Sequence, residues 1–273
     1  MVVSVHDEGS VRVVSIDRPR ALNALDPEHF VALDAAIGEA MLADGARVVV
    51  LAAVGRIFSI GADLAAFHAA LEEGTLPALL SDLLPVFQRT ILALAEGLKP
   101  TVAAVQGPAA GAGLDLALAC DLRVLSDRAS LSTAYGRVGL VPDGGASHHL
   151  ARLLGGARAA ELLLLPDRVV TPDEALRWGL ALEVAPREQV LPRALDLARR
   201  LAAGPRTATR LVRGLLREAP TRILADALEA EAAAQRVAAL DPDAAEGIRA
   251  AIERRPPAFQ GGGTTSPPPV SNP

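Results

Sequence analysis

Two glycine-containing turns carry backbone N–H groups that can bind an anion. Gly61-Ala62-Asp63 and Gly111-Ala112-Gly113 each follow an apolar run and precede a segment with helical spacing. The first N–H groups of a helix have no partner within the helix, and the helix dipole favours negative charge there. Glycine also lets the backbone approach a ligand closely. An ordinary strand-to-helix turn has the same glycines, so either turn taken alone leaves both interpretations open.

Other motifs with known chemistry are missing. The segment around Gly111 lacks the full G-x-G-x-x-G spacing, and the chain has no G-x-x-x-x-G-K-[ST] phosphate loop. Ser59 lacks the G-x-S-x-G surroundings of a hydrolase nucleophile. His148 and His149 are adjacent, hence on different faces of a helix, and do not have metal-ligand spacing. The two turns are therefore the most informative features.

Three side chains near the second turn can take part in proton transfer. Asp115 lies in the first turn of a predicted helix, Tyr135 follows, and Asp143 lies in the run V-P-D-G-G at 141–145. Each also has a structural interpretation. Asp143 can cap the next helix, and Asp115 can interact favourably with the dipole of its own helix. Tyr135 can be a packed aromatic residue with a hydrogen-bonded hydroxyl.

Composition limits the class of protein. The 273 residues are 51% hydrophobic and 22% charged, which suits one or two globular domains. A net charge of −5 argues against a general nucleic-acid binder, which needs a basic face. Cys120 is the only cysteine, so an intramolecular disulfide is impossible, and the first ten residues lack a basic, apolar signal segment. Charge interrupts the most apolar stretches, so we expect a soluble, cytoplasmic protein.

Strands and helices alternate along the segments that must position these residues. The patterns predict a hairpin over 2–16, helices over 27–41, 79–97 and from 114, strands over 47–53, 101–105 and 123–126, and a loosely specified helical segment over 64–84. This alternation predicts an α/β layered core over 1–195. Helical patterns near 207–218, 222–239 and 243–254 predict a helical region over 196–260. The Gly-, Thr-, Ser- and Pro-rich end predicts a disordered tail over 261–273.

Several segments, taken together and in order, resemble the crotonase (enoyl-CoA hydratase/isomerase) superfamily. They are RPRALNAL at 18–25, GRIFSIGADL at 55–64, KPTVAAVQG at 99–107, GAGLDLALACD at 111–121, GLVPDGG at 139–145, LLG at 153–155 and ALRWGL at 175–180. The resemblance continues to about Phe259. It implies an acyl-CoA-binding core built as a spiral of repeated β-β-α units. It also implies a C-terminal helical region that mediates trimer contacts, commonly within a hexamer made of two trimers.

The resemblance also assigns roles to the two turns. By position, the N–H groups of an oxyanion hole fall on Ala62 and Ala112. Such donors contribute about 3 to 4 kcal/mol each to a developing oxyanion. Ala112 stands where many members have glycine, but its N–H is retained. The substrate is expected to be an acyl-CoA thioester, and no separate cofactor is expected because coenzyme A is part of the substrate.

The proton-transfer residues differ from those of a hydratase. The family's hydratases use two glutamates around a water, and Asp115 and Tyr135 stand at those positions. A tyrosine with its ordinary pKa of about 10 is a poor base at neutral pH, so hydration is disfavoured. In relatives that shift double bonds, and in the dehalogenating ones, an aspartate at the position of Asp143 faces the acyl chain. We therefore expect double-bond isomerisation through an enolate, with Asp143 as base. Hydration of a 2-enoyl-CoA, and a non-catalytic acyl-CoA-binding homologue, are the alternatives.

Coenzyme A contacts are also implied by position. They fall on Arg20, Ala21, Leu22, Asp63 and Leu64. Ala65 stands where many members have a lysine, so one phosphate contact is missing or replaced. Arg20, or Arg254 and Arg255 of a neighbouring subunit, can replace it.

Overall fold

A six-stranded sheet lies at the centre of the computed structural model, which describes residues 2–259. Its strands, in spatial order, are β1 (Val3–Glu8), β2 (Val11–Ile16), β3 (Val48–Ala53), β4 (Thr101–Val105), β6 (Leu122–Ser126) and β8 (Glu183–Ala185). β1 is antiparallel to β2, and the other neighbours are parallel. A second sheet pairs β5 (Ala109–Ala110) with β7 (Leu131–Ser132). The predicted α/β class is confirmed, whereas the tail at 261–273 lies outside the described residues.

The central strands are apolar throughout because both faces of the sheet are covered. In β3, Val49 and Leu51 belong to one buried cluster, whereas Val48 and Val50 belong to a second cluster on the opposite face. This alternation follows from the two-residue period of a strand. A continuous apolar run is therefore the correct signature for these strands.

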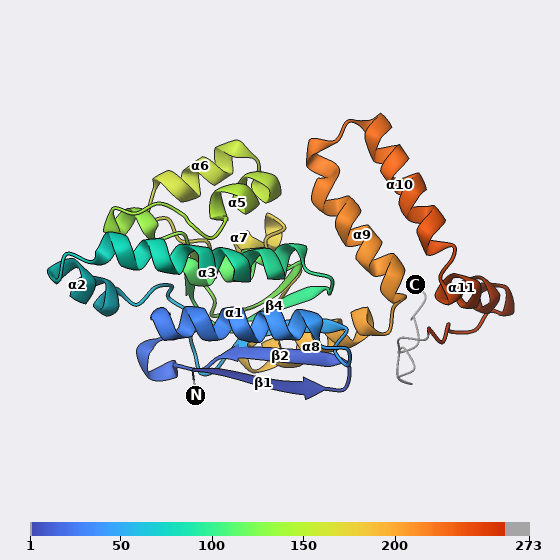
Figure 1. The fold of residues 1–273 in the computed structure, drawn as a ribbon, viewed down its shortest axis with the longest axis horizontal. Coiled ribbons are helices and arrows are strands. Elements are labelled where there is room, and N and C mark those ends of the chain that lie inside the picture. The colour runs from blue at the N-terminus through green and yellow to red at the C-terminus, as the bar shows by residue number, and fades with distance from the viewer. Residues whose placement is uncertain (1, 260–273) are drawn as a thin grey trace.

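Helices form the outer layers (Figure 1). One face packs against α1 (Pro27–Leu42), α3 (Leu76–Glu96) and α4 (Ala112–Ala119), and the other against α8 (Val190–Ala202). The remaining elements of this body are α2 (Leu64–Glu72), α5 (Ala146–Leu154), α6 (Gly156–Leu164), α7 (Pro172–Arg177) and the 3-10 helices η1 (Pro19–Ala21), η2 (Tyr135–Val138) and η3 (Arg187–Gln189). Helix α8 crosses the predicted boundary at 195 between the core and the C-terminal helical region, and the whole helix packs on the sheet of the core. The division of the chain into domains stays a prediction.

Helix α3 is long and apolar enough to meet the length and composition of a membrane span, although charge was expected to interrupt every such stretch. Its buried residues, however, form one stripe at helical spacing, which includes Leu83, Phe87 and Ile91. On its other side Arg89 binds Asp34 of α1, at 2.7 Å. A single apolar stripe with charged residues opposite is the pattern of a helix packed on a protein core.

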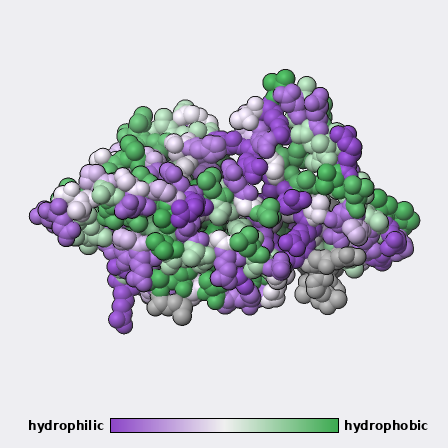
Figure 2. All heavy atoms as spheres, viewed as in Figure 1, coloured by the Kyte–Doolittle hydropathy of each residue, from purple (hydrophilic) through white to green (hydrophobic). Residues whose placement is uncertain are grey.

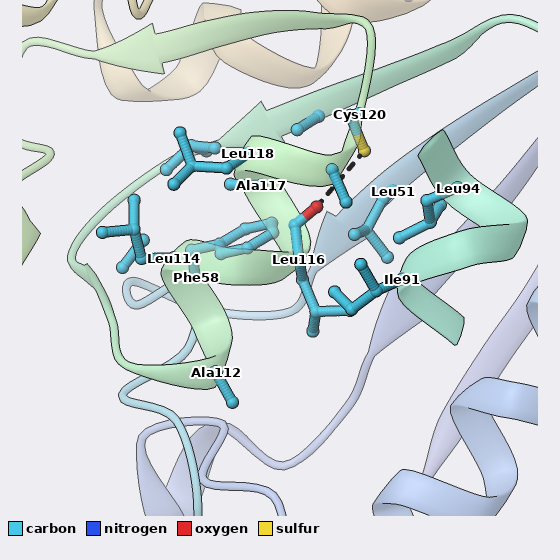
Figure 3. Packing of buried hydrophobic residues seen from close by; sticks show 14 of the residues in the cluster. Leu51, Phe58, Ile91, Leu94, Ala112, Leu114, Leu116, Ala117, Leu118 and Cys120 are labelled. Carbon is cyan, nitrogen blue, oxygen red and sulfur yellow. Dashed lines mark hydrogen bonds between the residues drawn. The ribbon is translucent and has the colours of Figure 1, made fainter. Parts of the chain in front are cut away.

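Helix α4 is fully buried, and its packing fixes the position of its first turn. Figure 3 shows its residues Leu114, Leu116 and Leu118 among the buried side chains of neighbouring elements, with Ala112 at the N-terminal end. Cys120 follows the helix and contacts the carbonyl of Leu116 at 3.5 Å. Burial raises the pKa of this thiol to about 12, so it remains protonated.

The last three α-helices, with a 3-10 helix between the first two, project from the body as a C-terminal arm, residues 206–253 (Figure 1). The arm comprises α9 (Arg206–Glu218), η4 (Ala219–Thr221), α10 (Leu224–Ala238) and α11 (Pro242–Glu253). Arg213 of α9 binds Asp121 at 2.8 Å and donates to the carbonyls of Leu94 and Gly97 at the end of α3. Apolar residues lie at the surface of the arm (Figure 2), among them Leu240, which is 87% exposed.

Candidate active site

The two glycine-containing turns lie side by side. The N–H of Ala110 donates to the carbonyl of Ser59 at 2.9 Å, and the N–H of Phe58 donates to the carbonyl of Pro108 at 3.1 Å. Gly61 has a φ of 89° and Gly111 a φ of 52°, values that favour glycine. A Cβ at Gly61 would lie only 2.8 Å from the carbonyl oxygen of Ala110. The glycines therefore permit the close approach of two segments that are 50 residues apart in the sequence.

Ala62 and Ala112 follow these glycines and line the same cavity. Within residues 2–259, neither backbone N–H donates a hydrogen bond. For Ala112 the cause is its place at the start of α4, where the first N–H groups have no acceptor in the helix. Two unpaired N–H groups on adjacent turns are able to donate to an oxygen that gains negative charge. The structure thus brings the predicted oxyanion-hole residues together.

Three buried polar side chains hold the first turn in place, and the sequence patterns did not reveal them. Asn23 donates to the carbonyl of Ile57 at 2.7 Å, and Gln106 donates to the same carbonyl at 2.9 Å. Ser59 donates to the carbonyl of Asn23 at 2.7 Å and accepts from the N–H of Gly61 at 3.2 Å. The available signal was the presence of amides and a hydroxyl within otherwise apolar segments, since such groups are buried only when hydrogen-bonded.

The cavity beside the turns has a volume of about 220 Å³ and a largely apolar lining. The lining includes three of the five phenylalanines and three leucines of α3, namely Phe30, Phe67, Phe87, Leu80, Leu83 and Leu84. The rings of Phe30 and Phe87 meet edge to face with centroids 5.2 Å apart. Such a lining suits an apolar group attached to a polar head that is held by the turns.

Tyr135 connects the two candidate aspartates. Its hydroxyl contacts Oδ2 of Asp115 and lies 3.0 Å from Oδ1 of Asp143. Tyr135 and Asp143 line the cavity, whereas Asp115 does not and is fully buried. The three predicted proton-transfer residues are therefore joined, but only two of them face the cavity.

The surroundings shift the pKa of all three groups. Burial raises the pKa of Asp115 to about 7, with a smaller increase from the charge of Asp143 and an opposing effect of the Tyr135 hydrogen bond. Burial also raises the pKa of Asp143, again opposed by Tyr135. Burial and both carboxylates raise the pKa of Tyr135, so its hydroxyl keeps its proton. At neutral pH this tyrosine is a hydrogen-bond donor and not a base.

The structure excludes a purely structural role as a helix cap for Asp143, whereas Asp115 and Tyr135 have the positions that their structural interpretations predicted. Asp143 does not cap the next helix, because the N-cap of α5 is Gly145 and no side chain accepts a hydrogen bond there. Asp115 lies in the first turn of α4 as predicted, but it binds Tyr135. Tyr135 is half-buried with a hydrogen-bonded hydroxyl, as its structural interpretation stated.

The residues proposed to contact coenzyme A lie on η1 and at the start of α2. Leu22 and Leu64 are exposed at 48% and 55%, and Leu64 also lines the cavity. Asp63 caps α2 by accepting from the N–H of Ala65 at 2.9 Å. Asp63 also binds Arg18 at 2.6 Å, so its carboxylate is already occupied. On η1, Arg20 is exposed and Ala21 is half-buried.

Arg18 joins the two parts of this proposed coenzyme A surface. Besides binding Asp63, its guanidinium donates to the carbonyl of Ala24 at 3.0 Å and lies 3.5 Å from a carboxylate oxygen of Asp26. Its sequence position next to a proline gave no sign of this role. Within residues 2–259, no group of three or more His, Cys, Asp or Glu side chains is arranged to hold a metal ion.

Comparisons with known proteins identify the family of the chain. Residues 6–262 match the model of the family described as enoyl-CoA hydratase/isomerase. The chain is 37% identical to a Thermus thermophilus protein named "Putative enoyl-CoA hydratase", over 93% of this chain and 98% of the relative. It is 32% identical to the 1,2-epoxyphenylacetyl-CoA isomerase of Escherichia coli, over 94% of this chain and 97% of the relative.

A solved structure shows the same similarity in three dimensions. The crystal structure of an enoyl-CoA hydratase from Polaromonas sp. JS666 superposes with a TM-score of 0.89 at 32% identity. The match covers 94% of this chain and 99% of the other. The shared fold therefore includes both the body and the arm.

Proposed function

This chain belongs to the enoyl-CoA hydratase/isomerase family, whose members are enzymes acting on CoA thioesters, and we propose that it isomerises the double bond of an enoyl-CoA. The resemblance to the crotonase superfamily is thereby confirmed. The observation that carries the specific proposal is that Asp143 is a carboxyl group in the lining of an apolar cavity that also contains Ala62 and Ala112. A base and an oxyanion site thus flank the same space.

The proposed reaction begins at the thioester carbonyl. Its oxygen accepts hydrogen bonds from the N–H groups of Ala62 and Ala112. When Asp143 removes a proton from the acyl chain, the C–H electron pair enters the conjugated system and negative charge develops on that oxygen. Each donor stabilises this charge by about 3 to 4 kcal/mol, because it is fixed in place before the charge forms.

Asp143 then returns the proton to a carbon two positions away, and the double bond moves. One carboxylate suffices, because the proton it takes is the proton it gives back. The apolar walls support this role, since burial raises the pKa of Asp143 and makes its carboxylate a stronger base. The reaction moves only protons, so we propose that it needs no cofactor beyond the coenzyme A of the substrate.

The arrangement of the three residues disfavours hydration. Addition of water requires a base for the water and an acid for the carbon, and family hydratases provide two carboxylates. Here the Asp115 side chain is fully buried and does not line the cavity. Tyr135 lies between it and Asp143, and its raised pKa makes it a poor base.

The cavity also suggests the size of the acyl group. A cavity of about 150 Å³ lined by Leu, Ile and Phe side chains is large enough for benzene. The volume of about 220 Å³ therefore suits a ring-sized apolar group with a few further carbons. The Escherichia coli relative is named for a phenylacetyl thioester, which is consistent with this size. We propose a compact acyl group of ring size as the preferred substrate class rather than a long chain.

The remaining assignments are part of the same proposal. The backbone of Ala21 and Asp63 and the side chains of Arg20, Leu22 and Leu64 contact coenzyme A. Leu64 lines the cavity, and the ion pair of Arg18 with Asp63 connects its segment to η1. The protein acts in the cytoplasm, where such thioesters are made and used. It assembles as a homotrimer or as a hexamer of two trimers.

Purified protein with 3-enoyl-CoA substrates provides the test. We expect formation of the conjugated 2-enoyl product, with the highest kcat/KM for acyl groups of ring size. Asp143→Asn should lower kcat about 100-fold or more, because the base is lost while the shape remains. Its Kd for the acyl-CoA, measured by calorimetry, should stay within about threefold of the wild-type value.

Other outcomes contradict the proposal in distinct ways. Full activity of Asp143→Asn would show that another group is the base. Loss of the absorbance of a 2-enoyl-CoA substrate in aqueous buffer would show that the enzyme is a hydratase. Tight binding without turnover of any enoyl or aryl thioester would show a non-catalytic binding protein.

A further inference from the structure

The hydroxyl of Tyr135 has one proton but two carboxyl neighbours. It contacts Oδ2 of Asp115 and lies 3.0 Å from Oδ1 of Asp143. A tyrosine hydroxyl donates one hydrogen bond and accepts others, and an ionised carboxylate accepts only. One of the two contacts therefore needs a proton from a carboxyl group. The three side chains together therefore hold two protons, one on the hydroxyl and one on a carboxyl group.

Burial indicates which carboxyl holds this proton. The Asp115 side chain is 0% exposed, whereas Asp143 is half-buried and lines the cavity. The free-energy cost of burying a charge is greater for the more enclosed group. The backbone of Gly144 also packs directly on Asp115, since a Cβ at Gly144 would lie 2.7 Å from its side chain. The negative charge is therefore more favourable on Asp143.

Within residues 2–259, no cationic side chain forms a hydrogen bond or ion pair with Asp115, and only Tyr135 and the backbone N–H groups of Gly144 and Ala146 oppose the effect of burial on its pKa. Helix α3 contributes the apolar Phe87 beside it, and the arginine further along α3 is bound to α1. Helix η2 carries Arg137, and α5 carries His148, His149 and Arg152. None of these four groups is among the main causes of the pKa shift of Asp115 or Asp143. Burial lowers the pKa of His149 to about 4, so it is neutral at pH 7.

We propose that Asp115 is a neutral positioning residue, whose carboxylic proton is donated to the Tyr135 oxygen while Tyr135 donates its own proton to the carboxylate of Asp143. The inference deepens the proposed function, because it explains how the base is held. Two hydrogen bonds in series fix the Tyr135 hydroxyl and direct it at Asp143. The network has a charge of −1 instead of −2, which matters because the enolate forms in the same cavity.

This arrangement predicts an alkaline decline in activity. The pKa of Asp115 is raised to about 7, so above that pH the residue ionises. Its charge then attracts the Tyr135 proton away from Asp143 and opposes enolate formation. We expect kcat to fall about tenfold per pH unit above this transition, which is a property of the whole network.

Asp115→Asn is the decisive variant, because its amide N–H replaces the carboxylic O–H and does not titrate. The variant should retain kcat within about fivefold at pH 6.5 and should lose the alkaline decline. Asp115→Leu is the matched control: it fills the space but donates nothing to Tyr135, so kcat should fall at every pH. If Asp115→Asn keeps the alkaline decline of the wild-type enzyme, Asp115 is not its source and the proposal is wrong.

A second measurement needs no substrate. In the wild-type protein with carbon-13-labelled aspartate carboxyls, NMR should show one aspartate that titrates near neutral pH, and Asp115→Asn should lack it. Titration of every aspartate below about pH 5 would overturn the proposal. If the neutral aspartate is present but no enoyl-CoA is converted, the network stands and the proposed function fails, so the two results are distinguishable.

Discussion

Ala62 and Ala112 have no reactive side-chain group, so their proposed chemistry depends on where the backbone holds two N–H groups. Helix α4 sets one position through its burial, and the hydrogen bonds of Asn23 and Ser59 set the other. At the residue scale, a variant that replaces one of these N–H groups can therefore test the oxyanion site while Asp143 stays in place.

Ala112→Pro is such a variant. Ala112 is the first residue of α4, where proline is tolerated because its N–H has no partner in the helix. We expect kcat to fall about 100- to 1,000-fold, the usual effect of losing one oxyanion donor. Thermal unfolding should change little. Ala112→Ser is the control, since it keeps the N–H and should keep most of the activity. An Ala112→Pro enzyme of normal kcat would exclude this donor.

The sequence identified the residues of this site more readily than their roles. Asp143, Asp115 and Tyr135 were identified by their positions in the resemblance to the crotonase superfamily, since each residue taken alone also has a structural interpretation. That Asp115 is enclosed while Asp143 faces the cavity depends on packing between α3, α4 and the segment before α5, which no local pattern records. The same holds for Arg18, whose partners are set by the folded chain.

At the element scale, the buried strands were predictable because a parallel strand covered on both faces must be a short apolar run. Strand β4 has the predicted bounds, Thr101–Val105. The cavity wall was harder, since the loosely specified segment over 64–84 is in fact two helices. Helix α2 ends at Glu72 and α3 begins at Leu76, with Gly74 at a φ of 68° between them. A helical pattern of apolar residues continues across such a break, so periodicity alone did not reveal it.

Arg213 determines how the arm joins the body. Its guanidinium satisfies carbonyls at the end of α3 that have no partner in the helix, and it binds Asp121 at 2.8 Å. We expect Arg213→Ala to lower the free energy of unfolding by about 1 to 2 kcal/mol, because the carbonyl of Gly97 loses its donor while Leu94 and Asp121 keep only their bonds from Thr101. Urea unfolding measures this change, and hydrogen exchange should increase in α9.

The control for this variant lies on the same helix. Arg217 forms an ion pair with Glu218 at the surface, with 42% of its side chain exposed. Arg217→Ala should change the free energy of unfolding by less than about 1 kcal/mol. Equal effects of the two substitutions would mean that α9 docks through its apolar contacts and not through Arg213.

At the scale of the whole molecule, the body and the arm differ in how they bury apolar residues. The body has two clusters on the faces of one sheet, whereas no residue of α9 or α10 is buried. Leu224, Leu240 and Ile252 of the arm are 75%, 87% and 78% exposed. Exposed apolar patches of this kind mark sites of protein association. The helical pattern of the arm was predictable from the sequence, but only the structure shows that the body does not bury the apolar residues of the arm.

In the proposed trimer, neighbouring subunits bury these apolar residues of the arm. Two glutamates introduced on the arm should therefore prevent trimer formation. We expect light scattering after gel filtration to give the mass of a trimer or hexamer for the wild-type chain. Leu224→Glu combined with Ile252→Glu should give monomers, because a buried unpaired carboxylate opposes association. Leu71→Glu is the control, since Leu71 is 59% exposed but lies on α2, at the end of the molecule opposite the arm (Figure 1). The arm is not the association surface if the wild-type chain is monomeric at micromolar concentration, or if the double variant keeps the wild-type mass.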